Sequence, residues 1–138
     1  MSQTNNAQQR KTVMVVDDEE QLRYLAALTL RRAGYKVYLA SSGEDCVEQQ
    51  IEKGISVDLT VLDCLMADLS AADTLATIKM QRPDTKVILS SGWVEEDEEQ
   101  LWFSRGVDAI LRKPYPPSML IKKVDTLLAQ LSETALVS

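Results

Sequence analysis

The segment Thr12-Val13-Met14-Val15-Val16-Asp17-Asp18 decides the fold, because it places a run of β-prone residues directly before two acidic ones. Four further β-prone runs begin at intervals of 22 to 28 residues: Lys36–Leu39, Asp58–Leu62, Lys86–Ser90 and Asp108–Leu111. Each interval accommodates one strand and one helix. The sequence therefore predicts a repeated strand–helix alternation.

Helical periodicity fills the stretches between these runs. Two apolar faces stand out, one formed by Leu22, Leu25, Ala26, Leu30 and Ala33 and the other by Leu120, Val124, Leu127, Leu128 and Leu131. Helix starts are indicated at Ser42 and Ser70, each with Asp three residues later, and Pro116 suits the first turn of the last helix. Gly34, Gly54 and Gly106 are placed to end helices. Each helix is expected to cover the sheet.

Strict alternation of strands and helices in one short chain implies a parallel sheet with right-handed crossovers and helices on both faces. We predict an α/β domain whose five-stranded parallel sheet is doubly wound, with strand order 2-1-3-4-5. The 138 residues suffice for one such domain. We expect it at residues 12–131, between a flexible leader at 1–11 and a C-terminal tail at 132–138.

The composition of the chain disfavours several classes of function. The net charge of −6 and the pI near 4.7 disfavour binding to nucleic acid. Apolar runs are too short to span a bilayer, and no signal-peptide core is found, so we expect no membrane association and a cytoplasmic location. The two cysteines lack metal-site spacing, and the absence of histidine excludes histidine-based chemistry.

Polar side chains follow four of the predicted strands: Asp17 and Asp18, then Asp63, then Ser91, then Lys113. In the predicted order these strands are contiguous, and ligands of such sheets bind at the carboxyl ends of the strands. Three carboxylates brought together repel one another unless a cation neutralises them. An open site of this kind suits Mg²⁺, or Mn²⁺, with a phosphoryl oxygen as a further ligand.

A carboxylate can itself accept a phosphoryl group. Asp63 is central among the predicted strand ends, which makes it the expected acceptor, while Lys113 and the Ser91 hydroxyl are suited to contact the phosphoryl oxygens. Ser90 is a competing choice for the hydroxyl.

The segments Val15-Val16-Asp17-Asp18-Glu19, Val61-Leu62-Asp63-Cys64-Leu65-Met66, Ile88-Leu89-Ser90-Ser91-Gly92 and Leu111-Arg112-Lys113-Pro114 together resemble the receiver domain of two-component response regulators, which has a flavodoxin-like fold. The resemblance covers about residues 12–131. It favours Ser91 over Ser90, because the hydroxyl residue of the family precedes a small residue, here Gly92.

The resemblance implies that Asp63 takes phosphate from a histidine kinase or a histidine phosphotransfer protein. It also implies that Asp17, Asp18, Asp63 and the Cys64 backbone carbonyl bind Mg²⁺, and that Ser91 and Lys113 contact the phosphoryl group. Such a chain acts on a downstream protein target. Apart from its own phosphorylation and dephosphorylation, it is not expected to be an enzyme.

Several positions depart from the family pattern. Ala67 and Ala71 replace a usual Pro and Gly, and Ile110 replaces the Tyr or Phe whose movement accompanies phosphorylation. Leu65 and Trp93, at the two positions that flank the path of an attacking water, are apolar. We therefore expect a long-lived acyl phosphate.

Two alternatives keep the same fold. The chain could be a pseudo-receiver that binds proteins without phosphorylation, or the receiver segment of a hybrid histidine kinase, which the Ser90-Ser91-Gly92-Trp93 run resembles. Two other classes are disfavoured. An aspartyl phosphatase of the haloacid dehalogenase type needs Asp where Leu65 stands, and the acidic residues 17–20 would repel the phosphate of a flavin nucleotide.

Overall fold

The computed structural model describes residues 10–64, 70–92 and 94–137, and it describes side chains as far as residue 129. Within these residues, five parallel strands form one sheet. The strands are β1 (Thr12–Val16), β2 (Lys36–Ala40), β3 (Leu59–Asp63), β4 (Lys86–Ser91) and β5 (Ala109–Arg112). Their order is β2-β1-β3-β4-β5, and every neighbouring pair is parallel. The predicted doubly wound α/β fold is confirmed.

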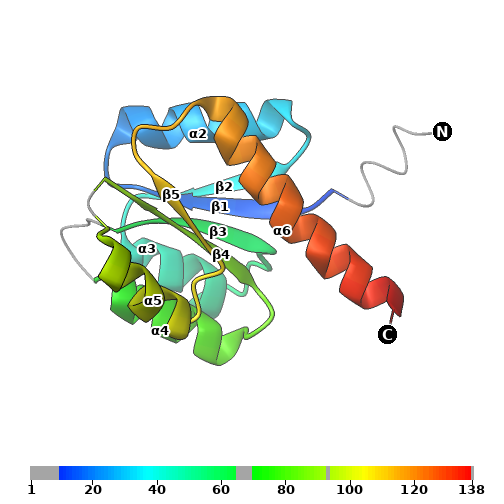
Figure 1. The fold of residues 1–138 in the computed structure, drawn as a ribbon. Coiled ribbons are helices and arrows are strands. Elements are labelled where there is room, and N and C mark those ends of the chain that lie inside the picture. The colour runs from blue at the N-terminus through cyan, green and yellow to red at the C-terminus, as the bar shows by residue number, and fades with distance from the viewer. Residues whose placement is uncertain (1–9, 65–69, 93, 138) are drawn as a thin grey trace.

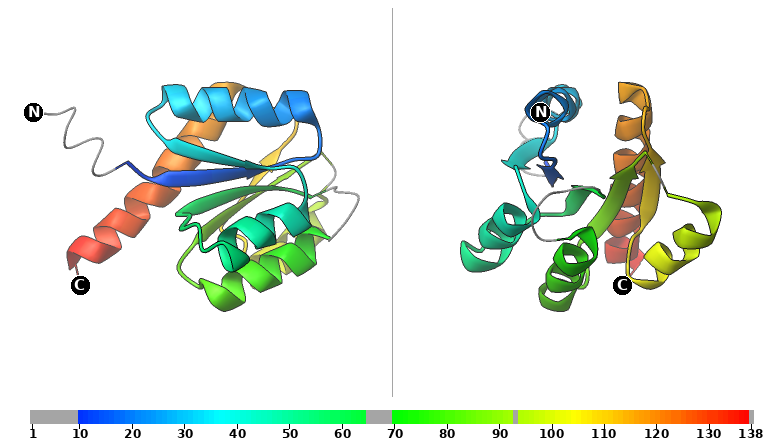
Figure 2. Two further views of the ribbon diagram at one scale, coloured as in Figure 1. Left: turned by 180° about the vertical axis from the view of Figure 1, so that it is seen from behind. Right: turned by 90° about the vertical axis from the view of Figure 1, so that its left-hand side faces the viewer.

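Helices cover both faces of this sheet (Figure 1). On one face lie α2 (Glu20–Arg32) and α6 (Pro117–Val137), and on the other lie α3 (Gly43–Val47), α4 (Ala71–Gln81) and α5 (Glu96–Ser104). A π-helical turn, η1 (Glu48–Glu52), continues α3. In the right-hand view of Figure 2 the carboxyl ends of the strands face the viewer, between the two helical layers.

Alternation along the strands divides the core into two clusters. In β1, Val13 and Val15 pack toward α2 and α6, whereas Met14 and Val16 pack toward α3, α4 and α5. These four side chains are at most 2% exposed. Burial on both faces explains why the strands are apolar runs rather than alternating patterns.

The predicted helix starts are confirmed at two serines. The Ser42 hydroxyl accepts the Asp45 N–H at 3.0 Å, and the Ser70 hydroxyl accepts the Asp73 N–H at 3.1 Å. All three predicted helix-ending glycines have positive φ, which residues with a side chain rarely adopt: Gly34, Gly54 and Gly106. The last helix corrects the prediction, because its first residue is Pro117, and Pro116 precedes it.

Ladder pairing extends four of the five strands by one residue beyond their predicted ends, while β1 ends at Val16 as predicted. The register pairs Val16 with Ala40, Asp63 with Ser90 and Ser91 with Arg112. Asp63 and Ser91 are consequently the last residues of their strands rather than loop residues. This fixes the backbone of both residues at the edge where the strands end.

The predicted buried face of the first helix is partly wrong. Leu30 is fully buried as predicted, but Leu22 is 39% exposed, Leu25 is 53% exposed and Ala33 is exposed. Ala27, which is not on the predicted face, is fully buried. The helix is therefore rotated about its axis relative to the predicted face, with the small Ala27 against the sheet. On the last helix, Leu120, Val124, Leu127 and Leu128 are buried as predicted, while the side chain of Leu131 lies outside the described residues.

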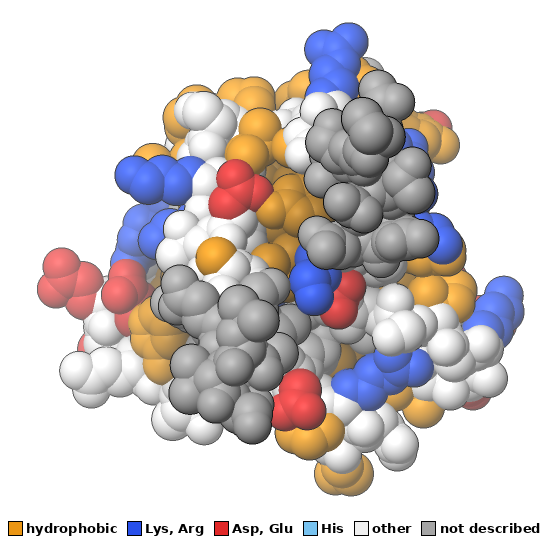
Figure 3. All heavy atoms as spheres, turned by 90° about the vertical axis from the view of Figure 1, so that its right-hand side faces the viewer, with side chains coloured by type: hydrophobic (Ala, Val, Ile, Leu, Met, Phe, Trp, Pro, Cys, Tyr) orange, Lys and Arg blue, Asp and Glu red, His pale blue; other side chains and the backbone are white. Residues whose placement is uncertain are grey.

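Figure 3 looks onto the amino ends of the strands, opposite the edge that carries the acidic residues. Acidic and basic side chains are mixed there with hydrophobic ones. No helix in the described part of the chain is both long and apolar enough to cross a membrane.

Candidate functional site

The predicted site residues meet at the carboxyl end of the sheet. Asp17 directly follows β1, Asp63 ends β3, Ser91 ends β4 and Lys113 directly follows β5. The four strands are contiguous in the sheet, and parallel strands present their carboxyl ends at one edge. Residues separated by almost 100 positions in the sequence thus share one site.

Three carboxylates form a compact cluster at this edge. One oxygen each from Asp17, Asp18 and Asp63 lies within 4.8 Å of the others. Asp17 is 7% exposed and Asp63 is 5% exposed, whereas Asp18 is open to solvent. Such proximity is costly for buried carboxylates without positive charge nearby. The cluster is therefore suited to cations.

The turn after β1 holds Asp17 in place. Its backbone N–H donates to the Ala40 carbonyl at 3.1 Å, and its carboxylate accepts the Glu19 N–H at 2.9 Å. Arg23 of α2 donates to the Asp17 carbonyl at 2.8 Å, a contact that sequence reasoning missed. The carboxylate is thereby oriented before any ligand binds.

Lys113 supplies positive charge to the cluster. Its Nζ lies 3.3 Å from Asp63 Oδ1 and 3.5 Å from Asp17 Oδ2. Burial lowers the pKa of Lys113, but the two carboxylates more than offset burial, so its pKa lies above the ordinary value. Lys113 is consequently an ammonium ion at neutral pH, placed between two carboxylates.

The two adjacent serines of β4 make different contacts. The Ser91 side chain hydrogen-bonds the thiol of Cys64, and the Ser91 carbonyl accepts the Lys113 N–H at 2.8 Å. The Ser90 hydroxyl instead lies 3.4 Å from the hydroxyl of Tyr115. Successive side chains of a strand point to opposite faces, which explains why the two hydroxyls diverge.

Cys64 follows Asp63, and its N–H donates to the Ser90 carbonyl at 2.9 Å. Burial raises the pKa of its thiol, and the hydrogen bond with Ser91 only partly offsets that effect. The side chain therefore behaves as a neutral thiol.

The donor set fits a hard divalent cation. Carboxylate oxygens are the ligands that Mg²⁺ and Mn²⁺ prefer, and one or two carboxylates with waters satisfy Mg²⁺. Two of the three carboxylates are buried, and Lys113 alone does not balance the three negative charges. Asp17, Asp18 and Asp63 are thus suited to hold such an ion.

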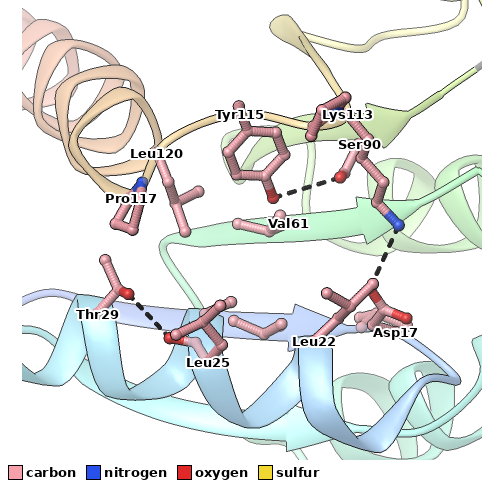
Figure 4. Close-up of a pocket in the computed structure, with 14 residues that line it drawn as sticks. Asp17, Leu22, Leu25, Thr29, Val61, Ser90, Lys113, Tyr115, Pro117 and Leu120 are labelled. Carbon is pink, nitrogen blue, oxygen red and sulfur yellow. Dashed lines mark hydrogen bonds and ion pairs between the residues drawn. The ribbon is translucent and has the colours of Figure 1, made fainter.

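A cavity of about 240 Å³ adjoins the carboxylates between α2 and α6 (Figure 4). Asp17, Ser90, Lys113 and Tyr115 line its polar end, and Leu22, Leu25, Ala26, Pro117 and Leu120 are among its apolar walls. Sequence reasoning did not select Tyr115. Its position two residues after Lys113 was the available signal, but which way its hydroxyl points is a tertiary property.

Three positions that depart from the family pattern, Leu65, Ala67 and Trp93, lie outside the described residues. Ala71 is the first residue of α4 and is buried. Ile110 is half-buried in β5 and packs against the core cluster beneath α3, α4 and α5.

Comparison with known proteins gives a consistent result. The family model of the response regulator receiver domain matches residues 13–125. The Bacillus subtilis alkaline phosphatase synthesis transcriptional regulatory protein PhoP is 31% identical over 119 residues, covering 86% of this chain and 48% of PhoP. The Brucella abortus sensor kinase CckA is 31% identical over 122 residues, covering 85% of this chain and 12% of CckA. The chain spans about half the length of the transcriptional regulators that it matches.

Two solved receiver-domain structures are similar to this chain over nearly their whole length. A response regulator receiver domain protein from Clostridium thermocellum is 27% identical with a TM-score of 0.82, covering 90% of this chain and 98% of that one. A CheY-like receiver domain protein from Methanospirillum hungatei is 25% identical with a TM-score of 0.81, again covering 90% and 98%. The architecture described above is shared with both.

Proposed function

The chain belongs to the receiver domain family of response regulators, and from this premise we propose that Asp63 accepts a phosphoryl group from a histidine kinase or a histidine phosphotransfer protein. Phosphorylation then changes the surface that a downstream protein target recognises. The observation that carries the proposal is the position of Asp63, a buried carboxylate beside two further carboxylates with the Lys113 ammonium 3.3 Å away.

The proposed step is a displacement at phosphorus. A carboxylate oxygen of Asp63 forms a bond to phosphorus as the bond between phosphorus and the donor histidine nitrogen breaks. The electron pair of that bond stays on the histidine ring, and the product is an acyl phosphate. Enzymes of phosphoryl transfer act mainly by positioning and by stabilising charge. Lys113 would serve both roles, and its closeness to Asp63 and Asp17 supports this.

Ser91 and Lys113 would contact the oxygens of the transferred group. Asp17, Asp18, Asp63 and the Cys64 carbonyl would hold Mg²⁺, which when bound neutralises charge on the carboxylates and the phosphoryl oxygens. The donor protein supplies the phosphohistidine. The chain is therefore proposed to accept phosphate rather than to be an enzyme with a separate substrate.

The match to CckA favours a second context for the same chemistry. This chain resembles a segment of that sensor kinase as well as segments of transcriptional regulators. As a receiver segment of a hybrid kinase it would still accept phosphate on Asp63. The two contexts differ in the donor and in the target.

Intact-mass spectrometry after incubation with acetyl phosphate tests the proposal. We expect one phosphoryl adduct that requires Mg²⁺ and that is lost in Asp63→Asn. Asp84→Asn is the matched control, because Asp84 is an exposed aspartate outside the cluster. Lack of an adduct in the native chain would overturn the proposal and favour a pseudo-receiver that binds proteins without phosphorylation.

A further inference from the structure

We infer that Tyr115 and Ser90 couple the phosphoacceptor site to the face formed by α2 and α6. This inference rests on the proposed phosphorylation of Asp63. The chain has Ile110 at the position where the family pattern has an aromatic residue that moves on phosphorylation. Tyr115 acts as a positioning residue, through Ser90 and Lys113, and does not contact the phosphoryl group itself.

Ser90 is tied directly to the acceptor strand. It is the register partner of Asp63 in the neighbouring strand, and its carbonyl accepts the N–H of Cys64 at 2.9 Å. Its side chain is 3% exposed, and its hydroxyl lies 3.4 Å from that of Tyr115. A shift of the backbone at Asp63 or Cys64 therefore reaches the Tyr115 hydroxyl through one residue.

Lys113 provides a second connection to the same tyrosine. Its Nζ now lies between Asp63 and Asp17, at 3.3 and 3.5 Å. A phosphoryl group on Asp63 adds negative oxygens beyond the carboxylate, and the ammonium must move to meet them. Only Pro114 separates Lys113 from Tyr115, so this movement is transmitted to the tyrosine through one intervening residue.

The surroundings give Tyr115 room to respond. Its ring is half-buried against the core cluster of α2 and α6, and it borders the cavity of about 240 Å³ (Figure 4). Leu22, Leu25 and Leu120 line the same cavity. A tyrosine that turns beside open space changes the shape of this wall without displacing packed core side chains.

Ile110 offers no equivalent connection. Its side chain has no hydroxyl, and it packs against the core cluster on the opposite face of the sheet. Ile110 is paired with Leu89 of β4 through the backbone, but of the two side chains only that of Tyr115 has a polar contact with the end of β4. The response to phosphorylation is thereby directed to α2 and α6 rather than to α5.

The test compares amide chemical shifts of the full chain before and after Mg²⁺ and beryllofluoride, a mimic of the phosphoryl group. In the native chain we expect the largest changes beyond the site itself at residues of α2 and α6 that border the cavity. Tyr115→Phe and Ser90→Ala should each reduce these changes by about 2-fold or more, with the melting temperature little altered. Ser90→Thr keeps the hydroxyl and should therefore retain the chemical shift changes of the native chain. Tyr24→Phe, at an exposed tyrosine of α2, is the matched control.

Phosphorylation of the same variants by acetyl phosphate separates the two proposals. An adduct on every variant, with the α2 and α6 response reduced only in Tyr115→Phe and Ser90→Ala, supports the inference. An adduct with changes centred on α5, or with an unchanged response in Tyr115→Phe, overturns the inference and leaves the proposed function intact. Lack of any adduct in the native chain overturns both.

Discussion

The Lys113 ammonium lies 3.3 Å from the carboxylate of Asp63, although 50 positions separate the two residues in the sequence. The contact is a consequence of strand order, since β3 and β5 both flank β4 and end at the same edge of the sheet. It places a cation where a phosphoryl group on Asp63 would carry its negative charge.

Lys113→Met should slow phosphorylation by acetyl phosphate by about 100-fold, because it removes the ammonium that would stabilise the transferred charge. Time courses of intact mass measure the rate. Lys122→Met, at an exposed lysine of α6, should leave the rate unchanged. Equal rates for Lys113→Met and the native chain would exclude Lys113 from phosphoryl transfer.

Mg²⁺ should raise the melting temperature, because an ion that binds only the folded state stabilises it. At a Mg²⁺ concentration about ten times the dissociation constant, the free energy of unfolding should rise by about 1.4 kcal/mol, which raises the melting temperature by a few degrees. Asp18→Asn should reduce this gain and raise the melting temperature without Mg²⁺, since it removes one repelling carboxylate from the cluster. Asp84→Asn should change neither value, and a Mg²⁺ effect that survives in Asp18→Asn would place the ion elsewhere.

Leu30→Ala and Leu25→Ala test the orientation of α2. Leu30 is fully buried, so its truncation should lower the free energy of unfolding by about 3 kcal/mol. Leu25 is 53% exposed, so its truncation should cost less than about 1 kcal/mol. Urea unfolding provides both values. Similar losses for the two variants would mean that Leu25 is buried in solution.

The two cysteines should differ in their reaction with iodoacetamide. Burial raises the pKa of Cys46 to about 12, so its thiol should stay unlabelled in the folded chain. Cys64 is only half-buried, and although burial raises its pKa as well, it should react slowly and faster as pH rises. Peptide mapping identifies the labelled residue, and Cys64→Ser should abolish native-state labelling.

The same shift of Cys46 affects stability. Its folded-state pKa lies above the ordinary value of 9.0, so the folded state retains the proton more tightly than the unfolded chain. The corresponding stability is fully present below pH 9 and is lost as pH rises toward 12. Cys46→Ala should therefore show a smaller loss of stability than the native chain over this range.

The residues that form the site could be predicted from the sequence, because their positions depend on local signals and on one topological rule. Apolar runs fix the strands, and Asp17, Asp63, Ser91 and Lys113 occur where those runs end. In a parallel sheet the ends of contiguous strands converge without any need for side-chain detail. The helix caps at Ser42 and Ser70 are equally local, since each involves a backbone N–H three residues away.

The tertiary structure alone decided how these parts face one another. Helical periodicity marks Leu22, Leu25 and Leu30 as one apolar face. Packing of α2 against the sheet and α6 buries Leu30 and Ala27 but leaves Leu22 and Leu25 partly exposed. Likewise Ser91 could be selected as the site hydroxyl, but the contact of Ser90 with Tyr115 depends on the loop between β5 and α6. Rotation of a helix and direction of a loop side chain result from contacts between distant segments, which local patterns do not encode.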